Sequence, residues 1–402
     1  MPRMRQRILG GRLAWSILQL PMLAQAWSCN DKGATVEMAR VQLGEADSLA
    51  VCNDGSESAY YFSATSSIDW LVYLAGGGWC HDAASCAARE DGTAYPHQAC
   101  ATSSTSSPCF MSSKDFPASC AKTGIFDSQG PFRDANKVYV PYCTSDAYMG
   151  DGFFDRWHFR GARVVRAVLK DLQKRGLGPG SRLVFGGGSA GARGAMVLLD
   201  EVKAQLPGVV VHGFLDSPYF IDIPSLAANF SGFQRQCADV LFNFNASSVV
   251  PETCSALYQR EDAWRCLFGQ YRMPFLRTPY LLVAAQFDSW QLSHLIHGYS
   301  GIEDNPNLTH AEVQYAEKFG ALTQKEAGRL QPFMPRGSFV YSAACYSHHI
   351  SEKESFFTAT TERGLSEFDA VRTIWAEEGS SIDTCTTYDC GSGCHSQVVL
   401  AI

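Results

Sequence analysis

Hydrophobic positions along this chain alternate between two patterns. Short runs rich in aliphatic and aromatic residues predict buried strands, whereas longer segments with apolar residues three or four apart predict helices. The predicted strands are Trp70–Leu74, Lys137–Pro141, Arg182–Phe185, Val209–Leu215, Pro279–Ala285 and Ser338–Ala343, and the predicted helices are Arg156–Arg175, Ala190–Gln205 and His310–Ala327. This alternation is typical of an α/β fold with a mostly parallel sheet and helices on both faces.

Two long segments interrupt the alternation. Residues 83–133 are rich in Ser and Cys and have few periodic apolar positions. They predict a long excursion that is pinned by disulfides and shapes the mouth of a pocket. Residues 220–275 contain three cysteines and many aromatic residues, and they predict a cap-like helical insertion. We find no internal repeat and no linker between domains.

The N-terminus has the pattern of a secretory signal. A basic stretch is followed by the apolar run 13–23 and by Ala24-Gln25-Ala26, a small-x-small cleavage sequence. The apolar run is short and contains Gln19 and Pro21, which disfavours a retained membrane anchor. We expect a signal peptide at residues 1–26 and a single domain at 27–402, with no stable membrane insertion after cleavage.

The composition agrees with a secreted or extracellular protein, such as one of the cell wall or the extracellular matrix. The 402 residues include 15 cysteines, and disulfides persist in the secretory pathway. Asn229, Asn245 and Asn307 each begin an N-glycosylation sequence. Removing residues 1–26 deletes four arginines and no acid, which takes the formal charge from −7 to −11. So acidic a chain is a poor nucleic-acid binder.

The cysteine-rich tail allows two interpretations. The spacing Cys385-x4-Cys390-x3-Cys394-His395 resembles a metal knuckle, but in an oxidising compartment a disulfide cluster is favoured. We find no HExxH or comparable ligand spacing, and we expect neither a metal nor a cofactor. The odd number of cysteines leaves at least one outside any intramolecular bridge.

The strongest local motif is Gly187-x-Ser189-x-Gly191, between the predicted strand at 182–185 and the predicted helix at 190–205. A strand, a tight turn and a helix in this order form a nucleophile elbow, which exposes the serine Oγ at the end of the strand. The alternative is a Gly-rich strand-to-helix loop that binds phosphate. The elbow predicts that Ser189 is a catalytic nucleophile.

The other parts of a serine hydrolase follow from chain order. Gly76-Gly77-Gly78 comes after an early strand, so the amides of Gly77 and Gly78, with that of Ala190, are predicted to form an oxyanion hole. The acid is Asp288 or Asp216, of which Asp288 is favoured because it follows the penultimate strand. The candidate bases after it are His294, His297, His310, His348, His349 and His395. The pair at 348 and 349 follows the last predicted strand, where a loop returns to the serine, but chain order alone does not separate the two.

Several short stretches, in order, resemble the pectin acetylesterase / Notum family of secreted carboxylesterases from about Val51 to Cys394. They are Cys52-Asn53-Asp54-Gly55, Gly76-Gly77-Gly78-Trp79-Cys80, Val140-Pro141-Tyr142-Cys143, Gly188-Ser189-Ala190-Gly191, Asp216-Ser217, Gln286-Phe287-Asp288 and Ala344-Cys345-Tyr346-Ser347-His348. The resemblance implies a Ser189–Asp288–His348 triad, because the Cys-x-Ser-His pattern of the family places the base at His348. It also implies the disulfides Cys52–Cys143 and Cys80–Cys86.

The chain departs from the family pattern at two places. Ala192-Arg193 follows the elbow instead of Gly, which puts a cation one turn past the nucleophile, where it would affect leaving-group preference if it faced the pocket. Ala75 stands where relatives have an acid before the glycines.

The expected function is that of a secreted serine carboxylesterase that removes O-acyl groups, acetyl first, from an extracellular glycan such as pectin. An alternative is a Notum-like removal of a palmitoleoyl group from a secreted protein. An alternative of another class is an inactive binding protein on the same fold. The intact Ser, Asp and His argue against this last alternative.

Overall fold

The computed structural model describes residues 29, 31, 33, 34, 36–94, 110–376 and 378–394. The predicted signal peptide at 1–26 and residues 95–109 lie outside the described residues. One sheet contains seven strands whose neighbours run parallel: β3 (Asp69–Leu74), β5 (Asn136–Val140), β8 (Arg182–Gly188), β9 (Val210–Asp216), β10 (Tyr280–Val283), β12 (Phe339–Ser342) and β14 (Gly379–Ile382). Antiparallel pairing adds β1 (Glu37–Gln42), β2 (Ala59–Ser63) and β4 (Ser119–Ala121) at one edge.

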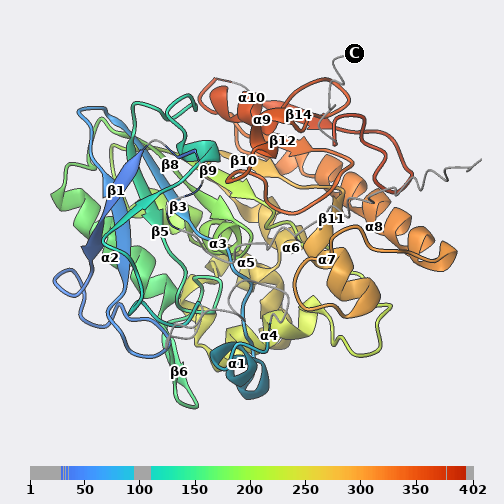
Figure 1. Cartoon of the computed structure of the whole chain (residues 1–402), viewed down its shortest axis with the longest axis horizontal. Coiled ribbons are helices and arrows are strands. Elements are labelled where there is room, and N and C mark those ends of the chain that lie inside the picture. The colour runs from blue at the N-terminus through green and yellow to red at the C-terminus, as the bar shows by residue number, and fades with distance from the viewer. Residues whose placement is uncertain are drawn as a thin grey trace, which may run out of the picture.

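The sheet has the order β14-β12-β10-β9-β8-β3-β5-β2-β1-β4 (Figure 1). All six strands predicted from the hydrophobic pattern are present in it, with ends that differ by a few residues. The four strands that the pattern missed lie toward the edges. β14, for example, has the sequence Gly-Ser-Ser-Ile, in which no apolar run marks a strand. The mostly parallel sheet is confirmed.

Helices lie on both sides of the sheet, as expected. Figure 1 shows α9 (Ser355–Thr358) and α10 (Glu367–Arg372) above the strands, and α3 (Ala190–Gln205) and α8 (His310–Arg329) on the other side. α3 has the predicted bounds, and α8 begins at the predicted residue. α8 is capped by Thr309, whose side chain accepts from the amide of Glu312 while the Glu312 side chain returns to the amide of Thr309.

The prediction of a helix from Arg156 was wrong at its start. α2 spans Gly161–Lys174, and the preceding residues form a hairpin of β6 (Gly152–Phe154) and β7 (Trp157–Phe159). The strands of the hairpin pair through their backbone amides and carbonyls, and these groups are then not available for the hydrogen bonds of a helix. The apolar periodicity belongs to the later part of the segment alone.

The two long interruptions contain helices and are tied by disulfides. The predicted cap-like insertion contains α4 (Phe233–Asn243), α5 (Glu252–Ser255), the 3-10 helix η4 (Arg260–Leu267) and α6 (Gly269–Arg272), and a disulfide joins Cys254 to Cys266. The Ser/Cys-rich segment 83–133 begins with α1 (Ala83–Glu90), is tied by Cys80–Cys86 and Cys29–Cys120, and in part lies outside the described residues.

The structure shows which of the described cysteines form disulfides. Cys52–Cys143 and Cys80–Cys86 are both present, as the family resemblance implied. In the tail, Cys385 pairs with Cys390 and Cys394 pairs with Cys345, which confirms a disulfide cluster in place of a metal knuckle. His395 lies outside the described residues. Cys237, on α4, is a free and buried cysteine.

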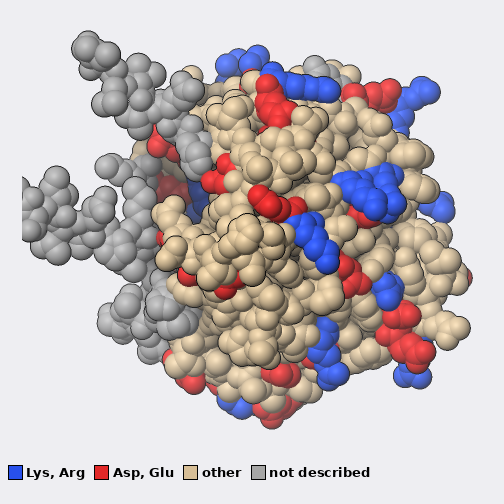
Figure 2. Space-filling view, turned by 90° about the vertical axis from the view of Figure 1, so that its right-hand side faces the viewer, with Lys and Arg blue, Asp and Glu red and all other residues tan. Residues whose placement is uncertain are grey.

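No helix within the described ranges has the length and apolar character needed to span a bilayer. On the face shown in Figure 2, basic and acidic side chains are interspersed, with uncharged surface between them. Neither sign of charge forms a continuous patch on that face.

Candidate active site

The predicted site residues meet at the carboxyl ends of the central strands. Ser189 follows β8, the glycine run follows β3, and Asp288 and His348 come after β10 and β12. Since β3, β8, β9, β10 and β12 are parallel neighbours, their carboxyl ends lie along one edge of the sheet. Segments that are far apart in the sequence are therefore brought to one place.

Ser189 lies in a strained turn between β8 and α3. Its backbone has φ 54° and ψ −122°, a conformation that side chains rarely adopt. The flanking glycines permit close packing here. A Cβ on Gly187 would lie 2.3 Å from the carbonyl oxygen of Leu74, and one on Gly191 would lie 1.9 Å from the same atom. These contacts fit the nucleophile elbow that the sequence predicts.

A continuous chain of hydrogen bonds joins the three predicted triad residues. His348 Nε2 lies 2.8 Å from Ser189 Oγ, and His348 Nδ1 lies 2.8 Å from Asp288 Oδ2. All three side chains are buried. The second carboxylate oxygen of Asp288 accepts from the amide of Gln291 at 2.9 Å, so both carboxylate oxygens are held.

A small parallel pairing sets the acid beside the base. β11 (Phe287–Asp288) pairs with β13 (Tyr346–Ser347), and Asp288 is opposite Ser347 in this register. The next residue in the chain is His348. The separation of acid and base is thus set by backbone hydrogen bonds as well as by the side chains.

Asp216, the competing acid, lies behind the histidine loop. Its Oδ2 accepts from the amide of Ser351 at 3.0 Å and from Ser351 Oγ at 2.6 Å, and its Oδ1 accepts from Ser217 Oγ at 3.0 Å. Burial raises the pKa of this fully buried carboxyl. Ser217 Oγ in turn accepts from the amide of His349. Asp216 therefore anchors the loop that carries His348.

The other candidate bases have different surroundings. His349 is half-buried next to His348, and desolvation of its ring holds its pKa well below the usual value. His294 hydrogen-bonds to the carbonyl of Trp290, and burial lowers its pKa to about 4. His297 lies beside Glu303, and His310 begins α8 on the surface. Among the described histidines, His348 alone bridges Ser189 and Asp288.

The glycine run passes directly beside the elbow. A Cβ on Gly76 would lie 2.9 Å from that of Ser189. Gly77 and Gly78 have φ values of 145° and 64°, which favour glycine, and a Cβ on Gly77 would meet the Phe110 ring at 2.5 Å. Among the described residues, the amides of Gly77, Gly78 and Ala190 donate no hydrogen bond to another protein group. They remain available to a negatively charged oxygen at Ser189.

Aromatic side chains surround the histidine. The Trp290 ring stacks on that of His348 at 5.8 Å between centroids, and Trp79, next to the glycine run, lies 6.2 Å from Trp290. Phe220 and Phe233, from the insertion, lie 5.6 and 6.0 Å from Trp79. Trp290, two residues after Asp288, was missed in the sequence analysis. Its place on the turn after the acid is the signal that would have found it.

Arg193 does not extend into open solvent. Its guanidinium lies 4.2 Å above the ring of Trp79, and Nη2 contacts Cys237 Sγ at 3.0 Å. Arg193 is 3% exposed. Through these contacts the side chain links α3, which carries it, to Trp79 beside the glycine run and to α4. The described residues contain no group of three or more His, Cys, Asp or Glu side chains placed to hold a metal ion.

Comparisons with known proteins point to one family. A family model described as Pectinacetylesterase matches residues 29–395. The chain is 30% identical to human "Palmitoleoyl-protein carboxylesterase NOTUM" over 74% of its own length, and 33% identical to "Pectin acetylesterase 11" of Arabidopsis thaliana over 61%. It spans 59% and 61% of the lengths of these two relatives.

The fold agrees with a solved structure. The crystal structure of the Wnt deacylase Notum from Drosophila matches with a TM-score of 0.74 at 24% identity, over 90% of this chain and 100% of that chain. This similarity shows the α/β-hydrolase-like architecture.

Proposed function

This chain belongs to the pectinacetylesterase family, and on that premise we propose that it is a serine carboxylesterase that removes short O-acyl groups, acetyl first, from an extracellular glycan such as pectin. The observation that carries the proposal is the Ser189–His348–Asp288 chain of hydrogen bonds beside glycine amides that are free to bind an oxyanion. We propose further that residues 27–402 form one secreted domain after loss of a signal peptide.

The arrangement supports a two-step acyl transfer. His348 Nδ1–H donates to Asp288, which leaves Nε2 to accept the proton of Ser189 as Oγ attacks the ester carbonyl. The amides of Gly77, Gly78 and Ala190 stabilise the resulting oxyanion, and each such donor contributes roughly 3 kcal/mol. His348 then protonates the leaving alcohol, and water releases the acyl group by the same route.

A second candidate function is the removal of a fatty acyl group from a secreted protein. The specific observation in its favour is the group of aromatic rings at the site. Trp290 stacks on His348, Trp79 lies against Trp290, and Phe220 and Phe233 pack next to Trp79. Apolar rings suit an alkyl chain. The same rings also pack on one another, with Phe220 and Phe233 4.8 Å apart.

The third candidate, an inactive binding protein, is disfavoured by the geometry. A binding module has no need of a strained serine with a histidine at 2.8 Å and a carboxylate behind it. Secretion is supported by the described disulfides, since such bridges persist outside reducing compartments.

Hydrolysis of p-nitrophenyl esters of increasing chain length decides between the candidates. We expect kcat/KM to be highest for acetate and to fall through butyrate, octanoate and laurate, with Ser189→Ala as the blank. A maximum at octanoate or laurate would select the fatty acyl alternative. Equal rates for the wild type and Ser189→Ala would contradict both esterase proposals and leave the binding protein.

A further inference from the structure

Arg89, on α1, holds the backbone of the glycine run from behind. Its Nη2 donates to the carbonyl oxygen of Gly77 at 2.7 Å. The C=O of Gly77 and the N–H of Gly78 belong to one planar trans peptide, so they point in opposite directions. A donor that fixes the carbonyl therefore fixes the amide of Gly78, one of the groups assigned above to the oxyanion.

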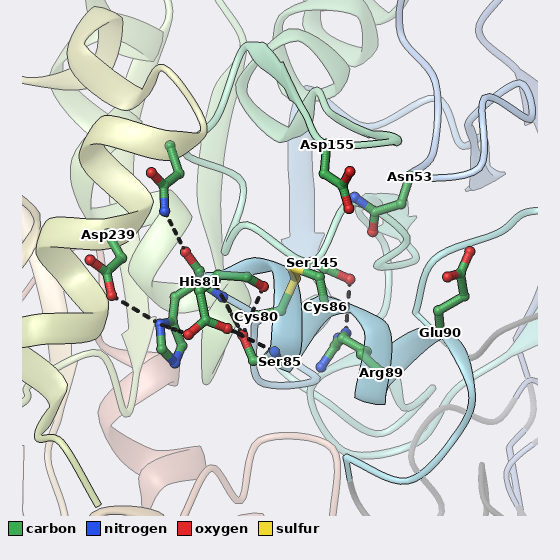
Figure 3. Close-up of a disulfide and its surroundings, with 12 residues drawn as sticks. Asn53, Cys80, His81, Ser85, Cys86, Arg89, Glu90, Ser145, Asp155 and Asp239 are labelled. Atoms are coloured by element: carbon green, nitrogen blue, oxygen red, sulfur yellow. Dashed lines mark hydrogen bonds and ion pairs between the residues drawn. A yellow bond between two sulfur atoms is a disulfide. The ribbon is translucent and has the colours of Figure 1, made fainter.

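The guanidinium itself is rigidly held. Arg89 Nε donates to Ser145 Oγ at 2.8 Å, and its central carbon lies 4.7 Å above the Phe110 ring. The side chain is 2% exposed. Figure 3 shows Arg89 reaching from α1 toward Ser145, with the Cys80–Cys86 disulfide beside this contact.

Ser145 links this arginine to both sides of the loop. Its Oγ donates to the carbonyl of Phe110 at 3.0 Å, and its own carbonyl accepts from the amide of Cys80 at 3.0 Å. The disulfide then joins Cys80 to Cys86 on α1, one turn before Arg89. The glycine run, α1 and the loop after β5 thus form a closed set of contacts around the guanidinium.

We propose that Arg89 is a positioning residue for the oxyanion hole, which orients the Gly77–Gly78 peptide and strengthens the Gly78 amide as a donor. A cationic donor that hydrogen-bonds to the carbonyl oxygen draws electron density from the peptide group, which makes the N–H of that peptide a stronger donor. Hydrogen bonds in such a series reinforce one another. Gly77 and Gly78 have backbone freedom that other residues lack, so an outside contact is needed to hold one orientation. This inference rests on the esterase function proposed above.

The test compares two buried arginines. Arg89→Met keeps the bulk of the side chain and removes the donor to Gly77. Arg272→Met is the matched control, because Arg272 is also fully buried but pairs with Asp200. The measurements are kcat and KM with p-nitrophenyl acetate, inhibition by a trifluoromethyl ketone, thermal stability and the crystal structure of each variant.

For Arg89→Met we expect kcat to fall about 10- to 100-fold with KM nearly unchanged, less than the loss of a whole oxyanion donor. Ketone binding should weaken by a similar factor, because its tetrahedral adduct carries the same negative oxygen. Arg272→Met should lower the melting temperature and leave kcat unchanged. In the Arg89→Met crystal structure the Gly77–Gly78 peptide should be rotated.

An unchanged kcat in folded Arg89→Met would overturn the proposal, as would equal losses of kcat in the two variants. A wild-type protein that hydrolyses no ester would refute the esterase function instead. The crystal structure then still decides the positioning role, which an unmoved Gly77 carbonyl in Arg89→Met would contradict.

Discussion

Ser189 has a strained backbone conformation, and the glycines two residues before and after it permit the close packing of this turn. Its Oγ contacts the ring nitrogen of a histidine whose other nitrogen contacts a carboxylate. Such a serine is activated by its partners and not by its own pKa.

Replacing Ser189 with Ala should abolish ester hydrolysis while the protein still folds and is secreted. Loss of the nucleophile typically lowers kcat on the order of a million-fold, with a residual rate from the remaining site. Hydrolysis rates and circular dichroism of the purified variant measure both effects. Turnover close to wild type in a folded variant would rule out the serine mechanism.

The two buried aspartates should respond differently to the same substitution. Asp288→Asn would place an amide beside His348 Nδ1 and favour the wrong tautomer, a change that can cost roughly ten-thousand-fold in kcat. Asp216→Asn alters the anchor to Ser351 and should cost less activity and more stability. Kinetics and thermal unfolding of the pair provide the comparison. A greater loss of kcat in Asp216→Asn than in Asp288→Asn would show that Asp216, at the end of β9, is the catalytic acid.

At the scale of elements, the segment Gly76–His81, which we propose contributes to the oxyanion hole, depends on contacts from α1 and α4 as well as on β3. His81 Nδ1 lies 3.1 Å from Asp239 Oδ2, and Asn243 Nδ2 donates to the His81 carbonyl at 2.9 Å. Both partners come from α4 of the insertion, as Figure 3 shows for Asp239. The insertion and the Cys80–Cys86 bridge therefore support the same short segment.

Removing the Cys80–Cys86 bridge should reduce the rate more than the stability. The bridge closes a loop with a sequence separation of only 6 residues, and even a 15-residue loop is worth about 3 kcal/mol of chain entropy. We expect a fall in kcat of about tenfold in the Cys80→Ala/Cys86→Ala double variant, since the oxyanion donors lose support. Kinetics and denaturant unfolding separate the two effects. Free thiols at both cysteines in the native wild type would remove this argument.

The join between the π-helix η6 (Ser293–His297) and α8 should depend on pH. His297 Nδ1 lies 2.6 Å from Glu303 and Nε2 lies 3.3 Å from Glu312, and the hydrogen bond to Glu303 raises the pKa of His297. The stabilisation is complete below the unfolded pKa and is lost as the pH rises through the folded one.

We therefore expect His297→Gln to reduce the free energy of unfolding by up to about 1 kcal/mol at acidic pH and by little at alkaline pH. Chemical denaturation on either side of neutrality measures the difference. His310→Gln, at the exposed first turn of α8, is the control. If His297→Gln reduced the free energy of unfolding more at alkaline than at acidic pH, the stabilising role assigned to protonated His297 would be wrong.

At the scale of the whole molecule, the disulfides that close long loops should stabilise the fold more than those that close short ones. Cys52–Cys143 spans 91 residues and joins the loop before β2 to the end of β5. Removing it as Cys52→Ala/Cys143→Ala should cost about 2–5 kcal/mol in the free energy of unfolding, because a long loop is released in the unfolded chain.

Below the melting temperature, kcat of the Cys52→Ala/Cys143→Ala variant should stay near the wild-type value, the reverse of the result expected at Cys80 and Cys86. Denaturant unfolding and peptide mapping without reduction test both parts. A large loss of kcat with unchanged stability would show that this bridge shapes the site as well.

Much of the central architecture follows from local sequence. Buried parallel strands are runs of apolar residues, so β3, β8 and β10 are visible in the hydrophobic pattern. The edge strands β4 and β14, and β1 next to β4, are not, because they are short or half-exposed and their pairing comes from distant residues. The prediction of helix from Arg156, over the strand β7, fails for a similar reason, since periodicity records the burial of a face and not which backbone groups pair.

The sequence by itself determined the elbow at Ser189, the glycine run and the order of serine, acid and histidine, because each depends on neighbouring residues or on chain order. Only the tertiary structure tied Asp216 to the loop that carries His348, put Arg193 under Trp79, and set Arg89 against the Gly77 carbonyl. These contacts join residues from separate elements. Their geometry is fixed by how the strands, helices and disulfide-linked loops pack, and no local pattern records it.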